Sequence, residues 1–127
     1  MPTSLQFRLQ TGPHSIPLDR VYRVAPFGAL RGEPEEYFAG WLRFYGHMVP
    51  VFDLNRVICE ASTPEEFGSR IMLVEAPPGA TVPYLGLLAP AVTETVAADN
   101  PGTTRFDLDL YLQMLANFVP AVPEGGS

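Results

Sequence analysis

Side chains able to do acid–base or nucleophilic chemistry are few in this chain and lie far apart along it. His14 and His47 are the only imidazoles, and Cys59 is the only thiol. His47 falls at a predicted turn and His14 at the start of a predicted strand, where an exposed polar residue needs no catalytic explanation. Ser69 follows a glycine but has none on its far side, so it lacks the sharp strand-to-helix turn that presents a nucleophilic serine. These residues predict no catalytic centre.

Two aspartates, Asp53 and Asp107, could be taken for paired carboxylates. Each stands between a phenylalanine and a leucine, directly before a segment predicted to form a helical turn. Capping the free N–H groups at a helix start explains an aspartate in that position better than acid–base catalysis does. The glutamates at 33–36 and 65–66 are predicted to lie in solvated loops, and one thiol with two imidazoles offers no zinc-ligand spacing. The sequence therefore predicts a protein that is not an enzyme and holds no metal or cofactor.

The charge balance disfavours several classes of partner. Fourteen acidic residues against eight arginines, with no lysine, give a formal net charge of -6 over 127 residues. That charge opposes the phosphate backbones of nucleic acids and the surfaces of anionic membranes. No window approaches the roughly 20 apolar residues that cross a bilayer, and a single cysteine fits a reducing compartment. We expect one cytoplasmic domain with no nucleic-acid binding and no membrane insertion.

The elements that must position any functional residue are mainly strands. The clearest is the stretch 38–54, an apolar strand, a tight turn at Gly46-His47 and a second apolar strand. Helical spacing of leucines and aromatic residues after Asp107 predicts one helix, which ends at Pro120. Further strands are predicted at 5–9, 14–18, 71–74, 84–88 and 91–96, and one or two helical turns at 55–59.

Three aromatic residues in the strand of this hairpin could form a binding platform. Strict alternation would place Trp41 and Tyr45 on one side of the strand and Phe44 on the other. We therefore expect one side to face the core and the other to face a partner.

An internal repeat relates the two halves of the sequence. One set of apolar positions recurs 71 residues later, and Phe52-Asp53-Leu54 recurs as Phe106-Asp107-Leu108 at an offset of 54. The later copy therefore lacks about seventeen residues, about the length of a strand hairpin. Two such half-copies predict two small barrel-like sheets packed together. The first set joins Ile16, Val21 and Val24 to Leu87, Val92 and Thr95.

The order and spacing of segments from Phe7 to Val96 resemble CheW-type chemotaxis adaptor domains. The matching pieces are the strand at 7–9, Ile16-Pro17-Leu18 with Val21 and Val24, 40–46, 49–54, 70–75, 86–88 and 92–94. The resemblance implies a mainly β fold of two small SH3-like β-barrels packed together, the second abbreviated, with a C-terminal α-helix. Residues 1–127 would form a single domain, with subdomain one at about 14–60, subdomain two at about 70–119 plus the N-terminal strand, and a tail at 120–127.

The resemblance also implies a function. It would be that of a non-catalytic adaptor that couples the cytoplasmic tip of a chemoreceptor to the regulatory domain of a CheA-type histidine kinase, in taxis, pilus motility or surface sensing. Receptor tips are helical, so a groove between the sheets is the expected receptor site. The resemblance places the family's receptor-facing surface, and hence the expected partner-binding residues, on Val21, Arg23, Val24, Gly40, Arg43, Tyr45 and Gly46.

Departures from the family pattern bear on the partners. Tyr45 stands where an arginine is usual, and Arg23 stands where an acidic residue is common, so the contact chemistry is expected to differ. The hairpin that the family carries between Val96 and Phe106 is missing, which would leave an open sheet edge for the C-terminal helix, a partner or a second copy to cover. Two alternatives stay open: a degenerate CheW-like module that mainly forms homodimers, and a small β-barrel ligand-binding protein or enzyme with a pocket of convergent polar groups.

Overall fold

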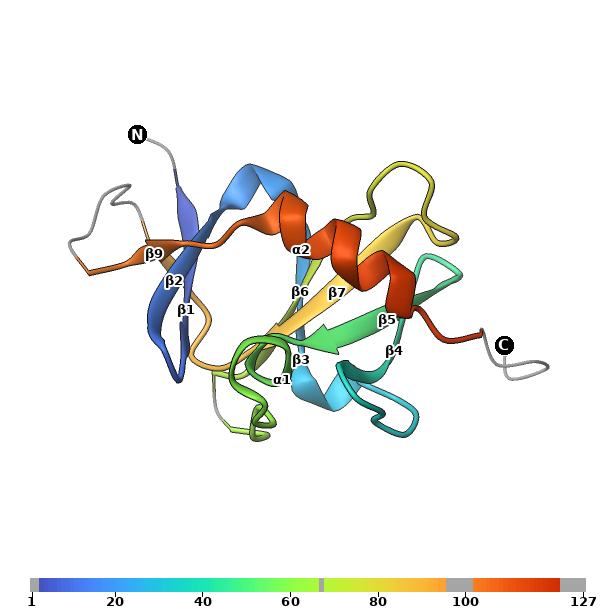
Figure 1. The fold of residues 1–127 in the computed structure, drawn as a ribbon, viewed down its shortest axis with the longest axis horizontal. Coiled ribbons are helices and arrows are strands. Elements are labelled where there is room, and N and C mark those ends of the chain that lie inside the picture. The colour runs from blue at the N-terminus through green and yellow to red at the C-terminus, as the bar shows by residue number, and fades with distance from the viewer. Residues whose placement is uncertain (1–2, 67, 96–101, 122–127) are drawn as a thin grey trace.

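The computed structural model describes residues 3–66, 68–95 and 102–121. It contains two sheets, a five-stranded one in the order β3-β6-β7-β5-β4 and a four-stranded one in the order β8-β1-β2-β9 (Figure 1). Its strands are β1 (Ser4–Leu9), β2 (Gly12–Pro17), β3 (Val21–Pro26), β4 (Phe38–Phe44), β5 (His47–Asp53), β6 (Arg70–Glu75), β7 (Tyr84–Ala89), β8 (Thr93–Thr95) and β9 (Thr104–Arg105). Its helices are α1 (Leu54–Cys59) and α2 (Leu108–Leu115), with 3-10 turns η1 (Leu18–Arg20), η2 (Phe27–Ala29) and η3 (Ala116–Phe118).

The predicted hairpin at 38–54 is confirmed as β4 and β5, but its turn lies one residue earlier than predicted. Tyr45 and Gly46 form the two-residue loop, with φ angles of 47° and 81°. Two successive residues with positive φ are the signature of a type I′ turn, whose twist matches that of the paired strands. His47 is therefore the first residue of β5, and Tyr45 has left the alternation of β4.

The centre of the five-stranded sheet is apolar on both faces. In β6, Ile71, Met72 and Leu73 are fully buried, as its continuous apolar run predicts. Neighbouring β7 runs antiparallel to β6 and parallel to β5. Gly86 of β7 passes so close to β5 that an added Cβ would lie 2.8 Å from a methyl carbon of Val51.

Two groups of buried side chains fill the molecule. The barrel core lies inside the curled five-stranded sheet and comprises Ala25, Ala39, Leu42, Phe44, Val49, Val51, Ile71, Leu73 and Leu88. The main core lies between this sheet, the four-stranded sheet and α2, which buries Leu108, Leu112 and Leu115. Burying these leucines holds α2 across the molecule on the side seen in Figure 1.

The second sheet is abbreviated, as predicted. Its central hairpin, β1 and β2, has six residues in each strand, whereas β8 has three and β9 has two. Of the strand predicted at 91–96, residues 93–95 form β8, and Val96 lies outside the described residues. The predicted C-terminal helix is confirmed, although its α-helical part ends at Leu115 and continues as η3. The fold is therefore mainly β, with two sheets and a C-terminal helix.

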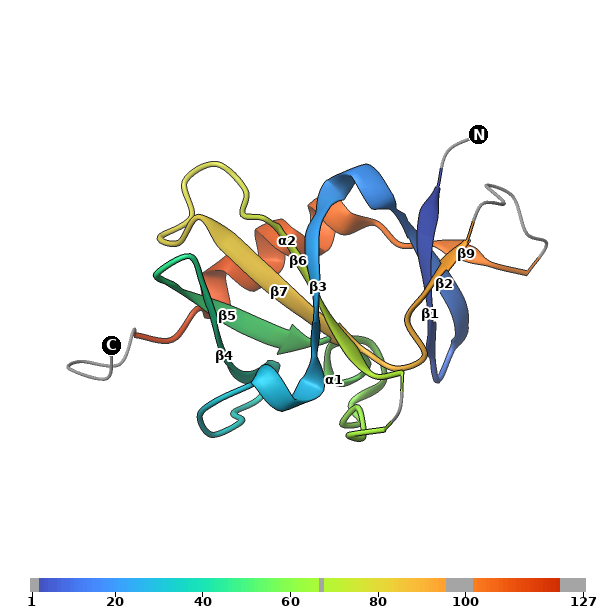
Figure 2. The ribbon, with the colours of Figure 1, turned by 180° about the vertical axis from the view of Figure 1, so that it is seen from behind.

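The chain crosses between the sheets twice. β2 of the four-stranded sheet leads into β3 of the five-stranded one, and β7 leads back into β8 (Figure 2). The segments related by the internal repeat, at 16–24 and 87–95, are the ones that make these crossings. The division into two subdomains stays a prediction, and the strand pairing assigns β6 and β7 to the five-stranded sheet. No helix in the described parts of the chain is long and apolar enough to cross a bilayer.

Candidate partner-binding surface

The predicted partner-binding residues lie on two elements, β3 and the β4–β5 hairpin. β3 pairs with β6 and is the first strand in the order of the five-stranded sheet, while β4 is the last. On β3, Arg23 and Val24 are exposed and Val21 is partly buried. On the hairpin, Arg43 and the turn residues Tyr45 and Gly46 are exposed, and Tyr45 keeps 84% of its surface.

A chain of aromatic rings joins these two elements. The ring of Tyr22 on β3 lies 5.4 Å from that of Tyr84 on β7, which in turn lies 5.2 Å from Phe44 at the end of β4. Phe44 meets Tyr45 at 4.6 Å, and His47 lies 6.0 Å from Tyr84. We call these five residues the aromatic cap. All five sit where β3, β5 and β7 begin and β4 ends, so the cap closes one end of the barrel core.

The cap combines rigid anchoring with exposure. Its rings meet edge to face, and such aromatic pairs contribute more stabilisation than their buried area alone would give. Phe44 belongs to the barrel core, while Tyr22 and Tyr45 are 58% and 84% exposed. Tyrosines fixed in this way lose little rotational freedom on binding, and tyrosine is enriched among residues that dominate interface energies. The cap is therefore suited to binding another protein.

Only part of the predicted set belongs to the cap. Gly40 is buried, and an added Cβ would lie 2.6 Å from the carbonyl oxygen of Arg31, so this residue serves local packing. Arg43 lies opposite Met48, which packs on the main core, so Arg43 faces away from the barrel core that Phe44 enters. The expectation that Tyr45 shares a side with Trp41 is wrong, because the turn carries the Tyr45 ring onto Phe44.

Sequence reasoning missed Tyr22, Tyr84 and the place of His47 in the cap. The register of β3 against β6 shifts between Val21 and Arg23, a β-bulge that places Tyr22 outside simple alternation. Tyr84 is the first residue of β7, and its pairing across the barrel end depends on the three-dimensional closure of the sheet. The sequence did offer one indication of the cap: tyrosines stand at the starts of two strands and in the hairpin turn.

Charges of both signs lie beside the cap, because the exposed Glu75 of β6 pairs with Tyr84 of β7. Arg23 follows Tyr22 on β3, and neither it nor Arg43 forms an ion pair within the described residues. The ion pair that the described residues do contain joins Arg20, two residues before Tyr22, to Asp109 of α2 at 2.7 Å. That hydrogen bond raises the pKa of Arg20 and lowers the pKa of the Asp109 carboxyl. An acidic protein therefore presents unpaired arginine close to its aromatic surface.

The residues weighed for catalysis have structural roles. Asp53 accepts hydrogen bonds from the backbone N–H of Asn55 and from the backbone and hydroxyl of Thr63, and Asp107 caps α2 through the N–H of Leu110. The Ser69 hydroxyl donates to the carbonyl of Pro64.

The remaining candidates fit the same pattern. The expectation that His14 is an exposed residue at a strand start is wrong: it is buried beside Phe7, with its Nδ1 2.9 Å from the carbonyl oxygen of Gly12. Cys59 is partly buried. Among the described residues, no three metal-ligating side chains cluster.

Comparison with known proteins bears on the fold. No family model and no curated protein matches the sequence. The structure is similar to the crystal structure of scaffolding protein TtCheW from Thermoanaerobacter tengcongensis, with a TM-score of 0.63 and 24% sequence identity over 79% of this chain. The chain has a CheW-like fold.

The match spans 64% of the length of the TtCheW chain. The structural similarity establishes the CheW-like fold. The binding chemistry has to be worked out from the side chains of this protein. Within that fold the aromatic cap, with Tyr45 at its tip, is the most exposed group of aromatic residues described here.

Proposed function

We propose that the protein is a non-catalytic adaptor that couples a chemoreceptor to a CheA-type histidine kinase in chemotaxis or a related signalling pathway. The observation that carries this proposal is the aromatic cap on a CheW-like fold. An adaptor acts by presenting surfaces to other proteins, and exposed, preorganised tyrosines suit that role. The same proposal places the protein in the cytoplasm as one CheW-like domain.

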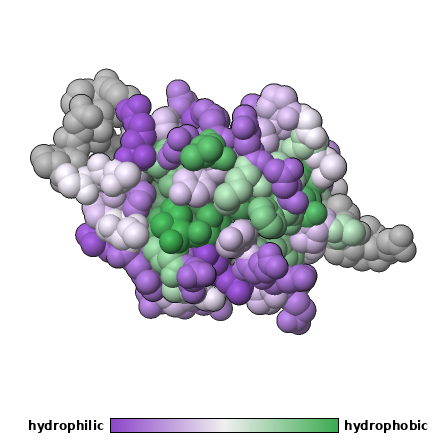
Figure 3. All heavy atoms as spheres, in the orientation of Figure 1, coloured by the Kyte–Doolittle hydropathy of each residue, from purple (hydrophilic) through white to green (hydrophobic). Residues whose placement is uncertain are grey.

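An adaptor of this kind needs two separate surfaces. The cap, flanked by Val21, Arg23 and Val24, supplies one at the barrel end, and we assign to it the helical receptor tip, which the family resemblance places on these residues. Figure 3 shows a second apolar area over α1 and the neighbouring part of α2. Val57, Ile58 and Cys59 of α1 are only partly buried, and we assign this area to the kinase regulatory domain.

Tyr45 gives a clean test, because its backbone conformation favours asparagine. Tyr45→Asn removes the ring while keeping a residue that tolerates the positive φ of a type I′ turn. We expect binding to a receptor-tip fragment to weaken about 30-fold, the loss of one hot spot of about 2 kcal/mol, with the kinase regulatory domain still bound. Isothermal titration calorimetry with each purified partner measures both affinities.

Matched variants make this test decisive. Tyr45→Phe keeps the ring and should bind within about threefold of the parent, since its hydroxyl faces solvent. No loss in Tyr45→Asn would remove the cap from the interface, and equal loss in both variants would reject the ring as the hot spot and assign the contact to the hydroxyl. Failure of the parent to bind either partner would reject the adaptor role itself.

A homodimerising module is the second candidate, and a specific feature favours it. Within the described residues, the outer strands of the four-stranded sheet, β8 and β9, are three and two residues long and pair with only part of the β1–β2 hairpin. Unpaired strand edges are templates for pairing between chains. Sedimentation analysis of the protein alone would show a dimer under this alternative, and a monomer would reject it.

A further inference from the structure

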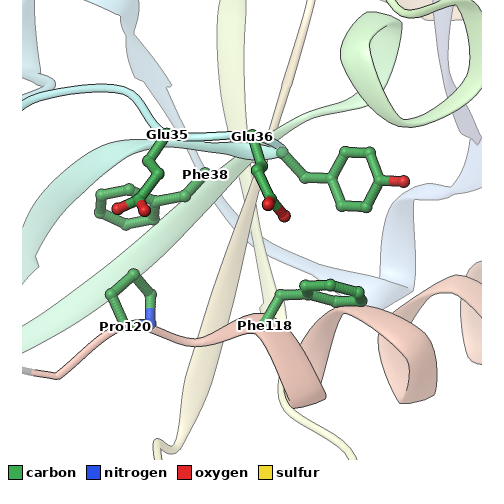
Figure 4. A pocket seen from close by; sticks show the side chains of 6 residues that line it. Glu35, Glu36, Phe38, Phe118 and Pro120 are labelled. Atoms are coloured by element: carbon green, nitrogen blue, oxygen red, sulfur yellow. The ribbon is translucent and has the colours of Figure 1, made fainter.

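A pocket lies between the loop that precedes β4 and the segment that follows α2. Its volume is about 200 Å³, and Figure 4 shows its lining from both segments. The carboxylates of Glu35 and Glu36 point into the space, opposite Phe118 and Pro120. The other lining residues are Tyr37 and Phe38. None of them belongs to the aromatic cap.

Backbone hydrogen bonds hold the acidic side of the pocket in place. Glu35 and Phe38 exchange N–H···O bonds of 2.8 Å in both directions, which closes a tight loop around Glu36. The carbonyl of Tyr37 accepts a 2.9 Å hydrogen bond from the N–H of Asp53 at the end of β5. The loop is thus tied to the five-stranded sheet, and the carboxylates sit on a fixed support.

Aromatic side chains join the two sides of the pocket. The ring of Phe118 packs edge to face against Tyr37 at 5.3 Å and remains 43% exposed. Phe38 is buried and lies 5.3 Å from the ring of Trp41. The pocket therefore has rigid aromatic walls and a rim of negative charge.

The chain supplies no cation to this pocket. It has no lysine, and none of its eight arginines, all within the described residues, lines the space. Glu35 and Glu36 form no ion pair in the part of the chain that the structure describes. Two carboxylates beside aromatic rings match a planar guanidinium, which stacks on an aromatic face and donates paired hydrogen bonds to carboxylates.

We propose that this pocket binds an arginine side chain of a partner protein. Arginine fits better than lysine because its flat, weakly hydrated head can contact a ring and a carboxylate together. The pocket uses no residue of the cap, so this inference does not depend on the adaptor assignment. It gives the molecule a charge-selective contact in addition to its apolar ones.

The test uses two small probes of nearly the same shape, one charged and one neutral. N-acetyl-arginine amide and its neutral isostere N-acetyl-citrulline amide are titrated into isotopically labelled protein and followed by NMR. We expect saturable shifts for Tyr37, Phe38 and Phe118 with the arginine probe, at millimolar concentration and weaker at high salt. Shifts of equal size with citrulline, or none with arginine, would overturn the proposal.

Charge-neutral variants assign the site. Glu35→Gln and Glu36→Gln should each weaken binding of the arginine probe about threefold to fivefold, the range of a single partly exposed ion pair. Glu33→Gln, an exposed glutamate of the same loop outside the lining, is the matched control and should change nothing. Equal loss in the control would mean general attraction to an acidic surface. A dimer that dissociates in the Glu35→Gln variant would assign the arginine to a second copy and reject a different partner.

Discussion

Asp53 and Asp107 look alike in sequence, yet the structure predicts very different costs for removing them. Both follow a phenylalanine, precede a leucine and cap a helix. Asp53 is 3% exposed and accepts three hydrogen bonds, at 2.6, 2.7 and 3.0 Å, from Thr63 and Asn55. Asp107 is exposed and accepts a single bond of 3.3 Å from Leu110. The test replaces each aspartate by alanine, as Asp53→Ala and Asp107→Ala.

The expected losses follow from these bonds. A hydrogen bond to a charged group contributes about 1.5 kcal/mol or more, so Asp53→Ala should lower the free energy of unfolding by about 4 kcal/mol. Asp107→Ala removes an exposed cap and should cost about 1 kcal/mol. Asp53→Asn keeps one acceptor oxygen and should lose about 2 kcal/mol, which provides a measurement if the alanine variant does not fold.

Urea denaturation followed by the fluorescence of Trp41, the only tryptophan, measures these differences. At a slope of about 2 kcal/mol per molar urea, Asp53→Ala should move the midpoint down by about 2 M and Asp107→Ala by about 0.5 M. Thr63→Val, which removes one of the three bonds to Asp53, should fall between them. If the two alanine variants lie within about 1 kcal/mol of each other, the buried network does not stabilise the fold as argued.

Two further predictions concern local packing and charge. Gly40→Ala should cost about 3 kcal/mol in chemical denaturation, because φ is +150° and the new Cβ would lie 2.6 Å from the Arg31 carbonyl oxygen; a loss below about 1 kcal/mol would contradict this. Arg20→Ala should lower the denaturation midpoint slightly at pH 7 and low salt, because the Arg20 hydrogen bond lowers the pKa of the folded Asp109 carboxyl. A carboxyl whose pKa is lower in the folded protein stabilises the fold at pH values above its unfolded pKa of about 4. This stabilisation is lost as the pH falls through the pKa of the folded protein, so the parent and the variant should converge near pH 2. A gap that persists there would point to packing instead.

The sequence predicted the parts of the fold that follow from local patterns. Apolar runs and alternation located the central strands. The hairpin turn was predicted at Gly46-His47 but lies at Tyr45-Gly46, because Gly46 can occupy either position of a two-residue turn and the sequence did not show which neighbour joins it. Helical spacing after Asp107 predicted α2 together with its cap. The missing segment in the second half correctly predicted an abbreviated sheet.

The candidate site was less predictable because it depends on closure of the barrel. Tyr22, Tyr84 and Tyr45 are far apart in sequence, and a β-bulge and a turn orient two of them. Neither irregularity leaves a periodic pattern. The pocket at Glu35 likewise needs the chain after α2 to return to the loop before β4, a contact between segments about eighty residues apart that no local pattern encodes.

The two crossings between sheets also determine when each sheet can form on the ribosome. All five strands of the larger sheet lie between Val21 and Ala89, so that barrel can assemble while synthesis continues. The smaller sheet joins β1 and β2, which precede the larger sheet in sequence, to β8 (Thr93–Thr95) and β9 (Thr104–Arg105), which follow it. The β1–β2 hairpin is synthesised before the larger sheet but pairs with β8 and β9, which follow that sheet in sequence, so the smaller sheet depends on the longer-range contacts and is expected to form later.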